Sequence, residues 1–237
     1  MYQYDTIEWK VEEKIGHLVL DQPPANSMDN RFFVELKDLV NGTIPGEDLD
    51  GILIYGRGRH FSSGAFLDDL FQNVLSYYKP YAGNRKKEVP EFLRDNLETF
   101  QSFGKMNVPV ISVIRGVCLG AALELTLFCH IRICAEGAVL GLPETSFNLL
   151  PGLGGVQNFI NLTNPLKTLE VVLGGNSFTP QEALEWNVVD RVTDKKIAFG
   201  YAIDFAKFVR GKYSRIRVKE LLEEFDENYY LHDSDNG

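Results

Sequence analysis

Apolar and polar residues follow one another in blocks along the chain, and the block lengths predict alternating strands and helices. Short apolar runs at 7–12, 16–21 and 51–55 are bounded by turn residues, as is typical of strands. Between the second and third runs, apolar residues recur at helical spacing after Asp29, which is placed to cap a helix. The pattern therefore predicts two strands, a helix and a third strand.

A weakly charged block at 108–155 stands out from the rest of the chain. It predicts a strand buried on both faces, a glycine-containing turn, a short apolar helix, a second apolar strand and a loop rich in glycine and proline. Two glutamates fall inside this block: Glu124 lies between two leucines on the helix, and Glu144 follows Pro143 in the loop. An ionised carboxylate is costly to remove from water, so both glutamates are candidate site residues.

Two turns of small residues each precede a predicted helix. They are the segments 61–66 (FSSGAF) and 117–122 (VCLGAA). A turn of this kind presents backbone N–H groups near a helix N-terminus, where they can hold an anion or a polarised carbonyl. Either segment alone is also typical of an ordinary strand-to-helix turn. Together, and beside two glutamates, they predict one pocket that receives a donor from each turn.

The remaining segments predict a shift from mixed α/β structure to mainly helix. A polar stretch at 76–91 indicates a solvated loop or a lid. Further elements are predicted as helices at 92–103, 156–162, 165–173, 195–210 and 214–228, an edge strand at 188–192, and a capping box that begins at Thr179. We therefore expect a core over 1–175 and a mainly helical region over 176–237.

Composition excludes several classes of function. The 237 residues include 24 Lys and Arg against 33 Asp and Glu, for a net charge of −9, so neither nucleic acid nor an anionic membrane is an expected partner. The three cysteines lack CxxC or zinc-site spacing, which predicts reduced thiols and no metal. With no apolar run long enough to span a bilayer and no signal region, we expect the protein in the cytoplasm.

Several motifs, in the expected order over most of residues 5–210, resemble the crotonase superfamily, the enoyl-CoA hydratase/isomerase family. They are PPANSM at 23–28, GRGRHFSSGAFL at 56–67, PVISVIRGVCLGAALEL at 109–125, CHIRICAEGAVLGLPE at 129–144, LLPGLGG at 149–155 and LGGNSFTPQEALEWNVVDRV at 173–192. The resemblance implies an α/β fold, a crotonase-like spiral of ββα turns with a C-terminal helical region. That region supports homotrimers, often paired into hexamers, in this family.

The resemblance also implies an acyl-CoA substrate, with coenzyme A as part of the substrate and no separate cofactor. It implies catalytic roles for Glu124 and Glu144 and an oxyanion hole formed by the N–H groups of Ala65 and Ala121. Other positions that match the family's substrate-binding motifs are Ala25, Ser63, Gly64, Gly120 and Gly152. The coenzyme A phosphates are expected near Arg57 or Arg59.

The chain departs from the family pattern at several positions. Ala121 stands where glycine is usual, and its N–H remains available if its φ is negative. Phe66 and His130 each replace a common aspartate, and we interpret His130 as a structural residue. The tail after Ser214 lacks an evident counterpart of the family's closing phenylalanine-rich helix, which affects the expected lid over the acyl chain.

The leading hypothesis is a hydratase of fatty acid metabolism that adds water syn across a 2-enoyl thioester. Both glutamates favour this reaction, with Glu124 expected to activate water and Glu144 to protonate Cα, although the two roles are exchangeable. One alternative is Δ3,Δ2-enoyl-CoA isomerisation, which needs one glutamate. Another is a non-catalytic protein that binds acyl-CoA or an acyl-carrier protein. The sequence leaves open the preferred acyl chain and the choice between coenzyme A and a carrier protein.

Overall fold

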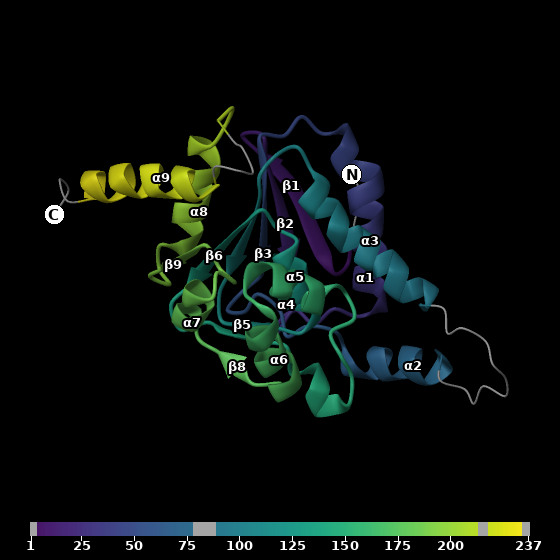
Figure 1. Cartoon of the computed structure of the whole chain (residues 1–237). Helices are drawn as coiled ribbons and strands as arrows, with labels where there is room; N and C mark the ends of the chain where they lie inside the picture. The colour runs from purple at the N-terminus through teal and green to yellow at the C-terminus, as the bar shows by residue number, and fades with distance from the viewer. Residues whose placement is uncertain (1–3, 78–88, 213–217, 234–237) are drawn as a thin grey trace.

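The computed structural model describes residues 4–77, 89–212 and 218–233 (Figure 1). Most of the predicted loop or lid at 76–91 lies outside the described residues. The fold is built around a six-stranded sheet in the order β1-β2-β3-β4-β6-β9, in which only β1 and β2 are antiparallel. Its strands are β1 (Ile7–Glu12), β2 (Ile15–Leu20), β3 (Gly51–Gly56), β4 (Val110–Ile114), β6 (Ile131–Ala135) and β9 (Arg191–Thr193).

The central strands are buried on both faces because helices cover both sides of the sheet. Every residue of β4 is buried, as its run of mainly β-branched residues without alternation predicts, and every residue of β6 is buried as well. Figure 1 shows α1 and α3 on one side of the sheet and α8 and α9 on the other. The two sides form separate apolar clusters: Phe32 and Phe100 belong to the first, and Tyr201 and Phe205 to the second.

A second, three-stranded sheet lies next to the site. It has the order β5-β7-β8 and comprises β5 (Val117–Leu119), β7 (Val139–Gly141) and β8 (Ser177–Phe178). The sequence predicts a turn at β5 and no strand at β7 or β8, since two or three residues carry no periodicity. This sheet fixes the end of β5, from which Gly120 leads directly into α4.

The helices agree with the predicted segments to within a few residues. The longer ones are α1 (Asn30–Asp38), α2 (Leu67–Tyr77), α3 (Glu91–Lys105), α4 (Ala121–Leu127), α5 (Gly155–Leu162), α6 (Pro165–Gly174), α7 (Pro180–Glu185), α8 (Ala198–Phe208) and α9 (Val218–Asp233), and the short turns are η1 (Leu39–Thr43), η2 (Ile44–Gly46) and η3 (Pro143–Phe147). The predicted caps are confirmed: Asp29 accepts a hydrogen bond from the N–H of Phe32, and Thr179 and Glu182 form a capping box.

The region after residue 175 is joined to the rest of the chain by strand pairing. Strand β8 pairs with β7, and β9 pairs with β6 at the edge of the large sheet. An edge strand is predicted here, but it begins at Arg191, three residues after the predicted start at 188. Helix α9 is attached through Asp226, which accepts a hydrogen bond from Tyr201 at 2.5 Å and pairs with Arg191 at 2.7 Å. A functional division between 1–175 and 176–237 remains a prediction.

Candidate active site

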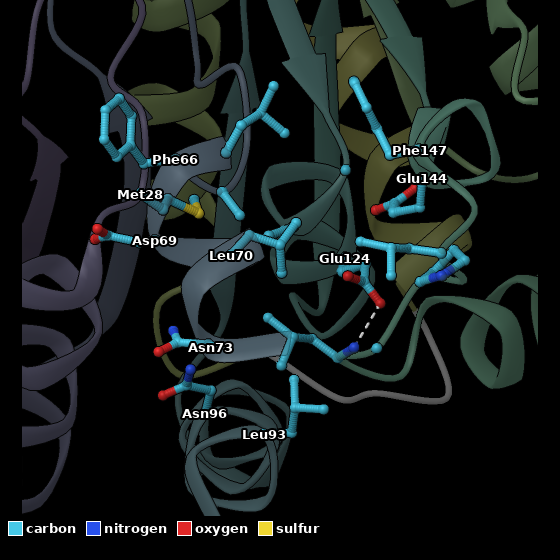
Figure 2. A pocket seen from close by; sticks show the side chains of 18 of the residues that line it. Met28, Phe66, Asp69, Leu70, Asn73, Leu93, Asn96, Glu124, Glu144 and Phe147 are labelled. Atoms are coloured by element: carbon cyan, nitrogen blue, oxygen red, sulfur yellow. Dashed lines mark hydrogen bonds between the residues drawn. The ribbon is translucent and has the colours of Figure 1, made fainter. Parts of the chain in front are cut away.

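A single cavity of about 1210 Å³ brings most of the predicted site residues together (Figure 2). Its walls come from the 61–66 turn, α2, α3, the start of α4, η3 and the 149–153 loop. The predicted residues that line it are Glu124, Glu144, Ala65, Ala121, Ser63, Gly120 and Gly152. Ala25 and Gly64 do not line the cavity; their carbonyl groups accept hydrogen bonds behind the 61–66 turn.

Glu124 is held in the cavity wall by two backbone hydrogen bonds. Its side chain is buried, and its Oε1 accepts from the N–H groups of Leu153 and Gly155, each at 2.8 Å. Figure 2 shows Glu124 beside Glu144, with a dashed line at its carboxylate that marks a hydrogen bond. Because both donors use one oxygen, Oε2 of Glu124 is left for a ligand or water.

Glu144 enters the cavity from η3 and lies close to Gly120. Its Oε2 is buried and accepts no hydrogen bond from any described residue. A β-carbon placed on Gly120 would lie 3.0 Å from Oε1 of Glu144, and Gly120 has φ of +54°. The positive φ favours glycine at this position, and an added side chain would also crowd the carboxylate of Glu144.

Burial changes the acidity of both carboxyl groups. It raises the pKa of Glu124 to about 8, with a further increase from the charge of Glu144 and an opposing effect of the two N–H donors. Burial also raises the pKa of Glu144 to about 7. Both pKa values are raised toward neutral pH, so the pair can share a single proton there and supply one acid and one base.

The two backbone amides expected to form an oxyanion hole have no hydrogen-bond acceptor within the described part of the chain. These are the N–H groups of Ala65 and Ala121. The two turns approach closely: a β-carbon on Gly64 would lie 2.4 Å from the carbonyl oxygen of Leu119 and 3.4 Å from the nitrogen of Ala121. The left-handed conformation falls on Gly120, and Ala121 has no positive φ, so the alanine keeps a usable N–H.

The residues behind the 61–66 turn fix its path. The carbonyl of Ala25 accepts from the N–H of Ser63 at 2.8 Å, and the carbonyl of Gly64 accepts from Met28 at 2.8 Å. Asn26, which the sequence analysis did not single out, is buried, and its Nδ2 donates to the carbonyls of Arg57, His60 and Phe61. Its position within the PPANSM motif was the one feature of the sequence that could have marked Asn26 as part of the site.

The two arginines expected near the coenzyme A phosphates differ in their ion pairing. The guanidinium of Arg57 is paired with Glu8 and, at 2.6 Å, with Asp21. The side chain of Arg59 makes no ion pair with a described residue, so Arg59 is the better candidate of the two. His130 has a structural role, since its Nδ1 accepts from the N–H of Val110 and its Nε2 lies 3.2 Å from the carbonyl of Gly104.

Two further classes of site find no support in the residues described. No three His, Cys, Asp or Glu side chains there come together in a group able to hold a metal ion. Within the same part of the chain, no helix is long and apolar enough to cross a membrane. Coenzyme A as part of the substrate, with no separate cofactor, stays a prediction.

Comparison with known proteins gives a consistent family. The family model described as enoyl-CoA hydratase/isomerase matches residues 10–232. A probable enoyl-CoA hydratase of Bacillus subtilis (strain 168) is 32% identical over 186 residues, which cover 78% of this chain and 68% of that protein. The fatty acid oxidation complex subunit alpha of Shewanella amazonensis is 30% identical over 89% of this chain, but the match spans only 29% of that longer protein.

Solved structures agree with this assignment. The crystal structure of an enoyl-CoA hydratase from Bacillus anthracis is 26% identical, with a TM-score of 0.75, over 97% of this chain and 86% of its own. Pseudomonas aeruginosa DspI is 25% identical, with a TM-score of 0.76, over 99% and 88% of the two chains. On its motifs, its fold and these matches, the chain belongs to the enoyl-CoA hydratase/isomerase family of the crotonase superfamily.

Proposed function

We propose that this protein adds water to 2-enoyl thioesters, with Glu124 and Glu144 sharing the proton transfers and the amides of Ala65 and Ala121 polarising the thioester carbonyl. One observation carries the proposal: the buried Glu124, the half-buried Glu144, both with raised pKa values, and two backbone amides without acceptors line one cavity. The proposed substrate is an acyl-CoA, and the family relationship supports it.

The amides supply electrostatic stabilisation. When water attacks Cβ, electrons move toward the thioester oxygen and produce an enolate. Two N–H groups directed at that oxygen stabilise its charge, and loss of one comparable donor in other enzymes costs about 10²–10³ in rate. The closeness of the 61–66 turn to Ala121 supports a shared oxygen site.

The glutamates complete the reaction without a change in their total proton count. A carboxylate takes one proton from water while the hydroxide oxygen bonds to Cβ, and a carboxyl group gives its proton to Cα. The pair therefore begins and ends with one proton, which matches its state between about pH 7 and 8.

The roles expected from the sequence are retained in the proposal. The N–H donors to Oε1 of Glu124 fix that carboxylate in the orientation needed to activate water, and the unpartnered Oε2 of Glu144 gives its proton to Cα. Burial raises the pKa of both carboxyl groups, so either one can hold the shared proton near neutral pH. The reversed assignment of the two roles is the alternative.

The experiment measures hydration of crotonyl-CoA and isomerisation of a 3-enoyl-CoA with wild type, Glu124→Gln and Glu144→Gln. Hydration in wild type and a loss of orders of magnitude in each variant would support the proposal, and the two losses should be non-additive. Isomerisation that needs only one glutamate would indicate an isomerase. Binding of acyl-CoA without any turnover would indicate a non-catalytic homologue.

A second measurement separates the two glutamate roles. Solvent deuterium exchange at Cα of butyryl-CoA requires only the residue that moves the Cα proton. The proposal expects exchange to be lost in Glu144→Gln and retained in Glu124→Gln. The opposite result would exchange the two roles and leave the hydratase assignment intact.

A further inference from the structure

Part of the cavity wall, formed by α2, α3 and the first residue of α1, is polar, unlike the leucine-rich surface around it. We call its three amides, Asn30, Asn73 and Asn96, the asparagine cluster; all three line the cavity. Nδ2 of Asn73 donates to Oδ1 of Asn30 at 2.9 Å, and the backbone N–H of Asn30 donates to Asp69 at 2.8 Å. Two of the three amides are therefore held in place by the protein.

Asn96 differs from the other two. It is half-buried on α3, and its side-chain amide makes no hydrogen bond with any residue that the structure describes. Figure 2 shows Asn73 and Asn96 at the same end of the cavity, with Glu124 and Glu144 at the other. An amide offers two donors and a carbonyl acceptor, so Asn96 is ready to bind a polar group that enters the cavity.

An apolar surface lies between the glutamates and these amides. Leu70 precedes Asn73 by three residues on α2, and Leu93 precedes Asn96 by three residues on α3, so each leucine shares a helix face with its asparagine. Both leucines line the cavity. An acyl chain that extends from the glutamates toward Asn96 would therefore have leucine side chains for its methylene groups to pack against.

The charge of the cavity limits the polar group further. Among the described residues that line it there is no Lys, Arg or His, whereas four carry carboxyl groups: Asp68, Asp69, Glu124 and Glu144. Among these described lining residues an anionic tail would find carboxyl groups and no counter-ion, which disfavours dicarboxylic acyl groups. A hydroxyl group can both donate to and accept from an amide and carries no charge.

We infer that Asn96 is a specificity-determining residue that binds a hydroxyl group on the distal part of the acyl chain, so that the preferred substrates are hydroxylated 2-enoyl thioesters. This inference rests on the proposed function for the identity of the thioester. The asparagine cluster selects the acyl chain, and the two glutamates and the backbone N–H groups of Ala65 and Ala121 act on the thioester end.

The test compares three CoA thioesters of equal length: 2-octenoyl-CoA, its terminally hydroxylated form and its terminal carboxylate, with a hexenoyl series as a second length. Hydration kcat/KM is measured for wild type, Asn96→Leu and Gln101→Leu. Gln101 is a matched control, because it is an amide on the same helix that does not line the cavity. Calorimetric Kd values for the saturated analogues are measured in parallel.

Wild type should prefer the hydroxylated chain over the alkyl chain by about tenfold at one of the two lengths, the scale of one hydrogen bond. Asn96→Leu should abolish this preference while retaining turnover of the alkyl substrate, and Gln101→Leu should leave it unchanged. An equal hydroxyl-to-alkyl ratio in wild type and Asn96→Leu, or a preference for the carboxylate, would overturn the inference. If wild type hydrates none of the substrates, the proposed function fails, and the Kd ratios of the saturated analogues still decide the role of Asn96.

Discussion

Gly155 lies so close to Glu124 that a β-carbon at this position would come within 2.8 Å of both Cγ and Oε1 of the glutamate. The same glycine donates its N–H to Oε1 at 2.8 Å. Hydrogen bonding and the absence of a side chain are therefore required together at residue 155. The start of α5 acts as a positioning device for a buried carboxyl group.

Gly155→Ala tests this device. The added methyl should displace Glu124, so crotonyl-CoA hydration should fall by about tenfold or more while far-UV circular dichroism is retained. Gly200→Ala is the matched control, since a β-carbon on Gly200, in α8, meets nothing within 4 Å. Equal activities of the two alanine variants would show that the position of Glu124 tolerates the methyl.

The pH dependence of activity follows from the two carboxyl groups. A reaction that needs one proton on the pair should show a bell-shaped kcat/KM profile, rising near pH 7 and falling near pH 8. Removal of the Glu144 charge lowers the pKa of Glu124, because that charge helps to raise it. Carbon-13 NMR titration of labelled glutamate in Glu144→Gln would detect this decrease, and an unchanged pKa would mean that the two groups do not interact.

The stability of the fold should also depend on Glu124. Its folded pKa of about 8 lies above the ordinary value of 4.5, so the folded state binds more protons than the unfolded state between these values. The contribution of Glu124 to the free energy of unfolding is therefore most favourable below pH 4.5 and is lost as the pH rises toward 8. Glu124→Gln removes this loss. The difference in Tm between the variant and wild type, measured by thermal unfolding, should therefore shift in favour of the variant from pH 5 to pH 8.5. A constant difference in Tm would contradict the assigned burial effect.

Replacement of Ala65 tests the oxyanion hole. Ala65→Pro deletes one N–H and should reduce kcat by about 10²–10³, whereas Ala65→Ser keeps the N–H and should retain most of the activity. Both variants are first checked for folding by near-UV circular dichroism. Normal turnover in folded Ala65→Pro would remove this amide from the proposed mechanism.

The oligomeric state remains a prediction. The structure moves the expected contacts between subunits from the C-terminal helices to α6. Phe205 and Val209 of the C-terminal region are buried within the chain, whereas Leu166, Leu169 and Leu173 on one face of α6 are 80%, 53% and 62% exposed. We expect a trimer or a hexamer, with Leu166→Glu and Leu173→Glu shifting it toward monomer by burying an unpaired charge. Light scattering that shows a monomeric wild type would contradict this expectation.

The sequence by itself determined most of the secondary structure and the candidate residues of the site. Helices and long strands extend over enough residues for periodicity to be visible, and caps such as Asp29 and Thr179 are local interactions. Glu124 and Glu144 stood out because carboxylates are rare in apolar segments. The resemblance then supplied the fold and the expected roles of both turns.

Only the tertiary structure decided how these parts meet. The short strands β5, β7 and β8 depend on pairing between distant segments, and the two N–H donors to Glu124 come from a loop 29 and 31 residues away. The polar end of the cavity is likewise formed by α2 and α3, whose asparagines look like ordinary helix-surface residues in the sequence. Burial, pKa and the charge of a cavity are properties of groups brought together in space, and local sequence does not specify them.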